Sequence, residues 1–112
     1  MTKIIFSEEF GKEFSEVEKR ASEGNGEAEH ILKVINKGVA KLYQNHEAGQ
    51  KIRRSLWPRI YSDKYSVDNL WRLRLDDSWR MIYTLKKESV EIKALVLDTM
   101  NHKRYDRLFG YR

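Results

Sequence analysis

The chain has 112 residues, of which 40% are hydrophobic and 35% charged, a composition typical of a globular domain rather than a disordered or collagen-like chain. It contains no cysteine, which excludes disulfides, thiolate metal sites and cysteine nucleophiles. The net charge of +5 is uneven: residues 1–50 carry 7 Lys/Arg and 9 Asp/Glu (−2), and residues 51–112 carry 15 and 8 (+7). This basic second half favours RNA, DNA or an acidic protein as partner, although a solvated basic surface would have the same composition.

No stretch of the sequence is apolar for long enough to span a membrane, and the apolar run at residues 4–6 is too short for a signal peptide. We therefore expect a cytoplasmic protein that does not contact a membrane. Neither an internal repeat nor a linker is visible. We expect one domain over residues 1–112.

The first half predicts a short strand at residues 3–6 and a helical hairpin over about residues 8–44. Ser7 is suited to cap the first helix, because two glutamates follow it in the first turn, where the helix dipole favours acids. Apolar residues recur with helical spacing to about residue 21, and again over residues 27–44. The Ser-Glu-Gly-Asn-Gly segment between these stretches predicts the turn of the hairpin.

Residues 45–68 are predicted to form an irregular basic loop. Long loops in compact domains tend to be functional or mobile. The basic residues Lys51, Arg53, Arg54 and Arg59 are interleaved with the aromatic residues Trp57, Tyr61 and Tyr65. Such a mixture suits a contact with a nucleic-acid backbone and its bases. Alternatively, the aromatics hold the loop to the body and the charges lie in water. We favour packing for the aromatics and function for the charges.

Residues 69–75 and 79–85 predict two strands around a turn at residues 76–78, whose Asp-Asp-Ser sequence suits a turn better than a pair of catalytic carboxylates. Apolar and cationic residues alternate, which puts the arginines on the face opposite the tryptophans. These arginines are Arg72, Arg74 and Arg80. We assign Trp71, Trp79 and Tyr83 to the core. A sheet that needed only stability would carry Thr or Val in place of the arginines, so we infer a function for this cationic face.

A third strand and a basic tail complete the chain. Residues 90–99 are apolar on both faces in their middle, which predicts an interior strand of the meander formed by residues 69–99. Residues 100–112 predict a short helix or tail. The order of one strand, two helices and three strands predicts an α+β fold with a small, mainly antiparallel sheet packed on a two-helix hairpin.

Three segments resemble the RelE/ParE superfamily, the toxins of type II toxin–antitoxin systems. SWRMIYTL (78–85) is similar to a family strand with an aromatic residue, Arg, two hydrophobic residues and Tyr, and NHKRYDRLFGY (101–111) is similar to the family's closing segment. YSVDNLWRLRL (65–75) resembles a subgroup with Asn-Leu-Trp before its second strand. The resemblance implies a βααβββ RelE-like fold. It also implies one of two activities, cutting mRNA in the ribosomal A site or inhibiting DNA gyrase.

For a ribonuclease, the resemblance implies a site made of cationic side chains, with no metal and no small-molecule cofactor. Arg80 matches the arginine of the family strand, and its planar guanidinium would bind the scissile phosphate. Proton transfer would fall to Tyr105, whose ordinary pKa of about 10 needs shifting, or to His102, at about 6.5. Further candidates for binding RNA phosphates are Arg74, Arg72, Lys51, Arg53, Arg54, Lys103 and Arg104.

Structural roles remain open for these residues. Arg80 could pair with the aspartates at 76–77 or with Asp98, His102 could bond a backbone carbonyl, and Tyr105 could be a packing residue. The tail departs from the family pattern, because Tyr105 follows His102 by three residues. A gyrase-inhibiting toxin and a catalytically silent binding protein therefore remain alternatives to the ribonuclease.

The resemblance also implies partners. They are mRNA on the ribosome and a cognate antitoxin, whose acidic segments would cover the arginines. Either a dimer or a heteromeric toxin–antitoxin complex is compatible with the sequence.

Overall fold

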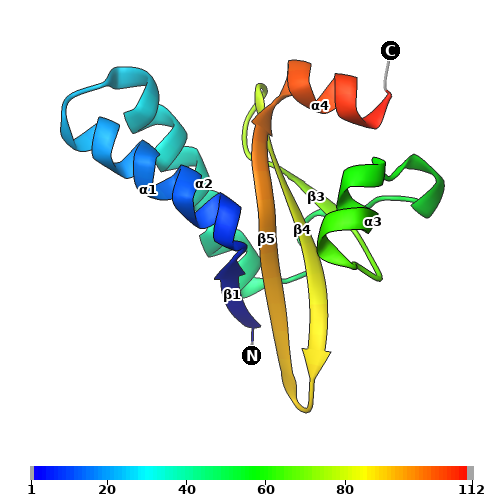
Figure 1. Ribbon diagram of the computed structural model, residues 1–112. Helices are drawn as coiled ribbons and strands as arrows, with labels where there is room; N and C mark the ends of the chain where they lie inside the picture. Colours follow the sequence, from blue (N-terminus) through cyan, green and yellow to red (C-terminus); the bar gives the residue numbers. More distant parts are fainter. Residues whose placement is uncertain (1, 111–112) are drawn as a thin grey trace.

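The structure, a computed structural model, describes residues 2–110, so residues 111–112 of the predicted tail and residue 1 lie outside it. It has the predicted α+β class (Figure 1). The elements in chain order are β1 (Thr2–Phe6), α1 (Glu8–Ser22), α2 (Gly26–Gln44), β2 (Gln50–Lys51), a 3₁₀ turn (Arg54–Leu56), α3 (Arg59–Tyr65), β3 (Trp71–Arg74), β4 (Trp79–Glu88), β5 (Glu91–Asn101) and α4 (His102–Phe109).

The sheet has the strand order β1-β5-β4-β3-β2. Among the described strands, only β1 and β5 pair in parallel, and the other neighbours are antiparallel, which confirms the predicted mainly antiparallel sheet. β5 lies between β1 and β4, as its apolar middle predicts. The β4–β5 hairpin is the longest part of the sheet, and its tip extends past the other strands at the lower end of Figure 1.

Side-chain caps fix the first turn of each helix of the hairpin. The hydroxyl of Ser7 accepts the backbone N–H of Phe10 at 3.1 Å, as predicted, and the side chain of Asn25 accepts the N–H of Ala28 at 2.9 Å. Gly24, in the turn between the helices, has a φ of +89°, a conformation that glycine adopts without a steric cost. These local signals explain why the hairpin boundaries could be predicted closely.

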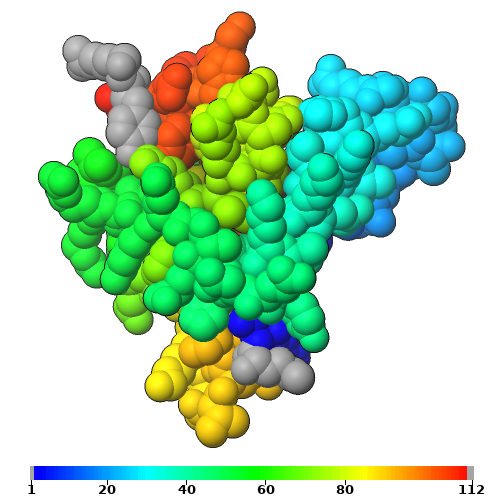
Figure 2. Space-filling view, turned by 180° about the vertical axis from the view of Figure 1, so that it is seen from behind, coloured from blue at the N-terminus to red at the C-terminus, as the bar shows by residue number. Residues whose placement is uncertain are grey.

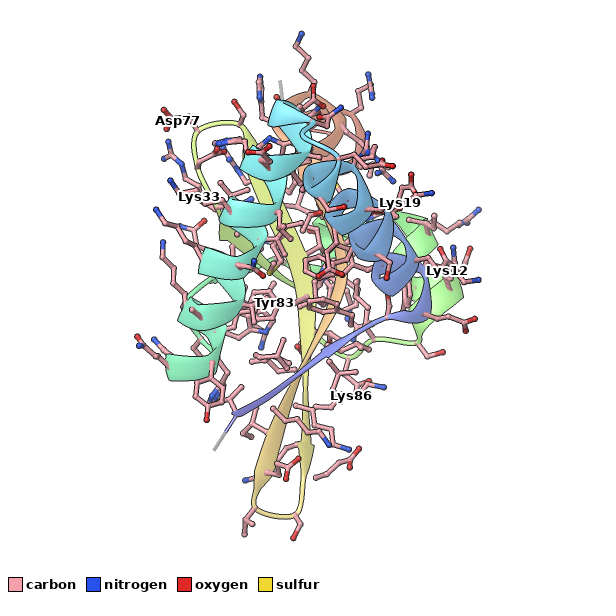
Figure 3. The ribbon with its side chains drawn as sticks, turned by 90° about the vertical axis from the view of Figure 1, so that its left-hand side faces the viewer. Lys12, Lys19, Lys33, Asp77, Tyr83 and Lys86 are labelled. Atoms are coloured by element: carbon pink, nitrogen blue, oxygen red, sulfur yellow. The ribbon has the colours of Figure 1, made fainter. Side chains whose placement is uncertain are left out.

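Both faces of the sheet are buried. The hairpin of α1 and α2 covers one face, and Figure 3 shows Tyr83 of β4 beneath it. This first core contains Phe10, Val17, Ala28, Ile31, Ile35, Leu42, Leu73, Met81, Tyr83, Ala94 and Val96, with Trp71 and Trp79 partly buried against it. Helices α3 and α4 cover the other face. This second core contains Ile52, Tyr61, Val67, Leu70, Ile82, Leu97, Met100, Tyr105 and Phe109.

The prediction of an irregular loop over residues 45–68 is wrong, because the segment contains β2, a 3₁₀ turn and α3. Its aromatics have the packing role that we favoured: Tyr61 is 2% exposed and stacks on Phe109, and the indole N–H of Trp57 donates to the carbonyl of Ile52 at 2.8 Å. Each element here is short and is stabilised by contacts with distant residues. A periodic pattern within the segment could not reveal them.

Asn69 extends the sheet beyond the start of β3. Its side-chain amide donates to the carbonyl of Leu85 at 2.9 Å and accepts the N–H of Leu85 at 2.8 Å. It also accepts the indole N–H of Trp71 at 3.1 Å, while its backbone carbonyl accepts the hydroxyl of Thr84 at 2.6 Å. The side chain thus satisfies backbone groups of β4 that no neighbouring described strand reaches.

Replacing Asn69 with alanine should therefore lower the free energy of unfolding by about 2 kcal/mol, because the partly buried N–H and C=O of Leu85 lose their partners. Urea denaturation measures this change. Asn36→Ala, on the exposed side of α2, is the matched control and should alter stability by no more than about 0.5 kcal/mol. Equal stability of the two variants would contradict the assigned role of Asn69.

Candidate functional site

An open groove of about 650 Å³ lies beside the cationic end of the sheet. We call it the arginine groove. It is lined by Lys41, Ala48, Gly49, Gln50, Arg72, Leu73, Arg74, Arg80, Tyr105 and Asp106. Figure 2 shows the side of the molecule where the contributing segments meet, namely the end of α2, residues 48–50, β3 and α4. Four cations and one carboxylate line it, so its charge suits an anionic ligand.

Arg72 connects three elements in this groove. It lies opposite Gln50 of β2, and its Nε and Nη2 atoms donate to the side-chain oxygen of Gln50 at 3.1 and 2.8 Å. Its Nη1 atom donates to the hydroxyl of Tyr105 at 2.6 Å. The ring of Tyr105 is stacked on Phe109 of the second core, and the residue is only 4% exposed. Tyr105 is therefore both a packing residue and a polar group held in the groove.

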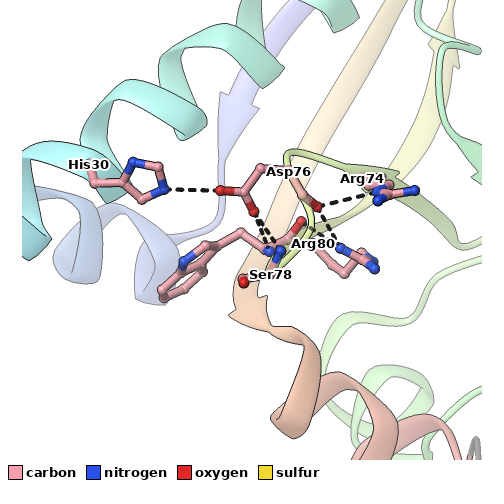
Figure 4. Close-up of polar contacts among 6 residues, drawn as sticks. His30, Arg74, Asp76, Ser78 and Arg80 are labelled. Atoms are coloured by element: carbon pink, nitrogen blue, oxygen red, sulfur yellow. Dashed lines mark hydrogen bonds and ion pairs between the residues drawn. The ribbon is translucent and has the colours of Figure 1, made fainter.

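Arg74 and Arg80 lie directly opposite each other on β3 and β4. Like charges at such a position destabilise a sheet. The backbone carbonyl of Asp76, in the turn between the strands, accepts from Nη1 of Arg80 at 2.8 Å and from Nε of Arg74 at 3.4 Å (Figure 4). Arg74 also pairs with the carboxylate of Asp77.

Arg80 has no carboxylate partner within residues 2–110. Besides the carbonyl of Asp76, its Nη1 atom donates to the carbonyl of Trp79 at 3.1 Å. Pairing with Asp76, Asp77 or Asp98 was the structural alternative for this arginine, and none of the ion pairs among the described residues includes it. The charge of Arg80 is thus oriented by neutral oxygens and remains available to an anion.

The predicted cations of the 51–54 segment do not line the groove. Lys51 lies opposite Trp71 in the sheet, so its side chain is on the face away from Arg72. Arg54 lies over the ring of Trp57, 4.7 Å from its centroid, and Arg53 is exposed. The structure does not bring these three residues together with Arg80.

The polar residues of helix α4 face different parts of the molecule. His102 is exposed, and its backbone N–H donates to the carbonyl of Ser78 at 2.6 Å. Lys103 is also exposed, and Arg104 points to Asp98, 3.4 Å away, instead of to the groove. Among the predicted candidates of this helix, Tyr105 is therefore the one that the groove includes.

Sequence reasoning missed three polar groups of the lining, Lys41, Gln50 and Asp106. Lys41 follows the helical pattern of an exposed position, and Gln50 depends on the short β2 strand that was not predicted. Asp106 could have been considered, because it is adjacent to Tyr105. In the part of the chain that the structure describes, no three His, Asp or Glu side chains are grouped to hold a metal ion, and no helix is long and apolar enough to cross a bilayer.

Comparison with known proteins supports the fold. No protein-family model matches the sequence, and no curated protein matches it. Among solved structures, the chain is similar to a YoeB/ParE toxin from Agrobacterium tumefaciens, with a TM-score of 0.58 and 12% identical residues over 89% of this chain and 98% of that one. The fold is that of the RelE/ParE toxins. The RelE-like fold that the sequence motifs implied is thereby confirmed.

Gly49 forms a wall of the groove at a point where the backbone approaches β3 closely. Its N–H donates to the hydroxyl of Tyr83 at 3.0 Å, and that hydroxyl donates to the carbonyl of His46 at 3.1 Å. A Cβ atom at Gly49 would overlap the backbone oxygen of Arg72 and lie 2.7 Å from the hydroxyl of Tyr83. Only glycine fits here without displacing the segment that carries Gln50.

Gly49→Ala should consequently destabilise the protein by about 2 kcal/mol or more, since the overlap is with backbone and with a buried hydroxyl. Gly11→Ala is the matched control, because that glycine lies in α1 and an added Cβ would contact nothing. It should stabilise the protein by up to about 1 kcal/mol through helix propensity. Thermal denaturation of both variants tests the contrast, and a neutral Gly49→Ala would refute the close approach.

Asp98 lies on the second-core face of β5, beside a small cavity of about 120 Å³ lined in part by Tyr61, Lys64 and Arg104. Its Oδ1 atom is buried without a hydrogen-bond partner in the described structure. Burial raises the pKa of this carboxyl to about 6, with Arg104 opposing the shift and Glu13 and Glu9 adding to it. Arg104 is thus engaged in compensating a buried carboxylate.

The folded protein holds the Asp98 proton to about pH 6, whereas the unfolded chain loses it near pH 3.8, so ionisation of Asp98 lowers stability as pH rises between these values. Asp98→Asn removes this dependence. Its stability relative to the wild type should increase from pH 4 to pH 7 by up to about 3 kcal/mol. Urea denaturation at both pH values measures it. Asp63→Asn, an exposed control on α3, should give no such trend, and a trend equal in both variants would contradict the assignment.

Proposed function

We propose that the chain is the toxin of a type II toxin–antitoxin system and that it cuts ribosome-bound mRNA without a metal ion, using the arginine groove as its phosphate site. The observation that carries this proposal is the charge of Arg80. It is oriented by backbone carbonyls, is not neutralised by a carboxylate of the described chain, and faces a groove with three more cations. The likeness of the fold to a YoeB/ParE toxin supports the toxin part of this proposal.

Cutting RNA by attack of the 2′-hydroxyl requires removal of its proton, stabilisation of charge on the phosphate and protonation of the leaving 5′-oxygen. Arg80 and Arg74 supply the second requirement, because guanidinium groups match pairs of phosphate oxygens. Lys41 adds a further cation to the same lining. The arrangement therefore supports charge stabilisation by side chains alone.

Proton transfer is assigned to Tyr105 in this proposal. Its hydroxyl lies in the groove within hydrogen-bond distance of Arg72, and its ring is fixed by Phe109. His102 lies outside the lining and is exposed at the start of α4, which favours Tyr105 over it. Asp106, the carboxylate of the lining, would accept the proton of the 2′-hydroxyl, and the hydroxyl of Tyr105 would donate a proton to the leaving 5′-oxygen.

An antitoxin would inhibit such a toxin most directly by covering the arginine groove. An acidic segment could pair with Arg80 and Arg74, displacing mRNA from the charges that bind it. The exposed cations outside the groove, Arg53 and Lys103 among them, would extend that contact. Co-purification of a co-expressed acidic partner supports this part of the proposal, and its absence counts against it.

A toxin that binds DNA gyrase is the second candidate. The observation that favours it is the scatter of the predicted RNA-binding cations, because Lys51, Arg54 and Arg104 lie away from the groove. A broad basic surface suits contact with a protein or with DNA near it. Inhibition of supercoiling by the purified protein, with translation unaffected, would select this function. If neither supercoiling nor translation is affected, a silent binding protein is selected.

Replacing Arg80 with alanine should reduce cleavage of ribosome-bound mRNA by about a hundredfold or more, because a preorganised charge facing the phosphate is removed. Primer extension on a translating mRNA measures the cuts, and growth arrest on expression gives the cellular counterpart. Arg20→Ala is the control, since it removes an arginine at the end of α1 that does not line the groove.

Cuts within the A-site codon that are present with wild type and Arg20→Ala but absent with Arg80→Ala would support the ribonuclease. An Arg80→Ala variant that remains folded and fully active would exclude Arg80 from the reaction. The complete absence of cuts with wild type, under conditions where ribosomes translate, would favour the gyrase-binding alternative.

A further inference from the structure

The side chains of His30 and Asp76 join the turn between β3 and β4 to the helical hairpin. Nε2 of His30, on α2, lies 2.9 Å from Oδ2 of Asp76 (Figure 4). The second oxygen of Asp76 accepts the backbone N–H groups of Ser78 and Trp79 at 2.8 and 2.7 Å. Because a carboxylate can only accept, His30 donates to it.

Asp76 holds the groove arginines with a different atom. Its backbone carbonyl accepts from Arg80 at 2.8 Å and from Arg74 at 3.4 Å. The orientation of this carbonyl follows from the conformation of the turn, and the carboxylate of the same residue fixes that conformation. Although burial alone would raise the pKa of the Asp76 carboxyl, the hydrogen bonds from Ser78, His30 and Trp79 keep it below its ordinary value. The carboxylate is thus ionised near neutral pH and attracts its donors strongly.

His30 is itself held by a rigid element. It precedes Ile31 on α2, which is 6% exposed in the first core, and α2 lies close to the sheet at Gly38. A Cβ atom at Gly38 would overlap the side chain of Leu75, which follows β3, and would lie 3.3 Å from the side chain of Met81 on β4. Packing between α2 and the sheet therefore fixes the backbone of His30, and Leu75 at the start of the turn takes part in that packing. The ring itself is 55% exposed and is oriented by its bond to Asp76.

We propose that His30 and Asp76 are positioning residues for the arginine groove, which transmit the fixed position of α2 through the β3–β4 turn to Arg74 and Arg80. Neither residue lines the groove. Two adjacent guanidinium groups repel each other, and the shared carbonyl of Asp76 keeps them close enough to bind one phosphodiester. The role assigned to the phosphodiester rests on the proposed function, whereas the effect on the arginines does not.

The first test uses the free protein, so that it is independent of any ligand. In ¹⁵N NMR spectra, His30→Ala should shift the Nε–H resonances of Arg74 and Arg80 and increase their motion. His30→Gln should restore them, because its amide N–H reaches about as far as Nε2 of histidine. Asn36→Ala, at an exposed position of the same helix, should leave them unchanged. Arginine resonances that do not respond to His30→Ala would overturn the proposal.

The second test measures binding of a fluorescent single-stranded RNA dodecamer by anisotropy at several salt concentrations. His30→Ala should weaken binding on the order of tenfold, because misplaced groups forfeit most of their benefit. It should also reduce the slope of log affinity against log salt by about 0.7 for each phosphate that the variant no longer binds. Reduced folding stability alone would leave the slope unchanged, and that result would count against a positioning role.

The two tests separate this inference from the proposed function. If wild type neither binds the RNA nor cuts mRNA, while the arginine resonances respond to His30→Ala and recover in His30→Gln, the proposed function fails and the positioning role is upheld. If wild type binds and cuts, and His30→Ala changes neither the resonances nor the salt slope, the proposed function is upheld and the positioning role is wrong.

Discussion

The pairing of β4 with β5 is the constraint on which the rest of the structure depends. These two strands carry side chains into both cores, so each position along β4 must suit either the helical hairpin on one face or α3 and α4 on the other. Met81 and Tyr83 face the hairpin, and Ile82 faces the second core. Because successive side chains of a strand point to opposite faces, the position of Met81 determines the face of Arg80. It must lie on the face of the second core, next to the end of the strand.

That placement explains how a sheet buried on both faces can present arginines. Arg72 is opposite the buried Ile82, and Arg80 is opposite the buried Met100. The side chains of both arginines therefore leave the sheet on the face of the second core. They escape full burial because they lie near one end of the sheet, where α4 leaves a groove instead of closing the face. The long stem of an arginine can lie along apolar neighbours while its charged end stays in water. The groove therefore exists because the second core does not extend to the end of the sheet.

The sequence predicted those features that depend on neighbouring residues. The cap at Ser7, the turn at residues 76–78 and the face shared by Arg72, Arg74 and Arg80 all follow from local chemistry and from a period of two, and all are found in the structure. Contacts between distant segments could not be predicted in the same way. The position of Gln50 beside Arg72 depends on a two-residue strand, and the turning of Arg104 toward Asp98 depends on a buried carboxylate. Candidate residues near one another in the sequence were therefore divided among different surfaces.

The division of the candidate residues among different surfaces affects which of them could take part in catalysis. A catalytic site needs its groups held within about 0.5 Å of their working geometry, and rigid elements achieve this better than loops. Arg80 is partly buried on a paired strand, and Tyr105 is stacked against the second core. Arg74 is exposed, but it is bonded to the carbonyl of Asp76 and to the carboxylate of Asp77. The side chains of Arg53 and Lys103 are exposed, and no hydrogen bond or ion pair among the described residues holds them, so they keep their rotamer freedom. Such cations suit long-range attraction of a polyanion, which depends on charge rather than on geometry. In the proposed function, attraction of the polyanion is thus distributed over the surface of the protein, and orientation of the phosphodiester is confined to the groove.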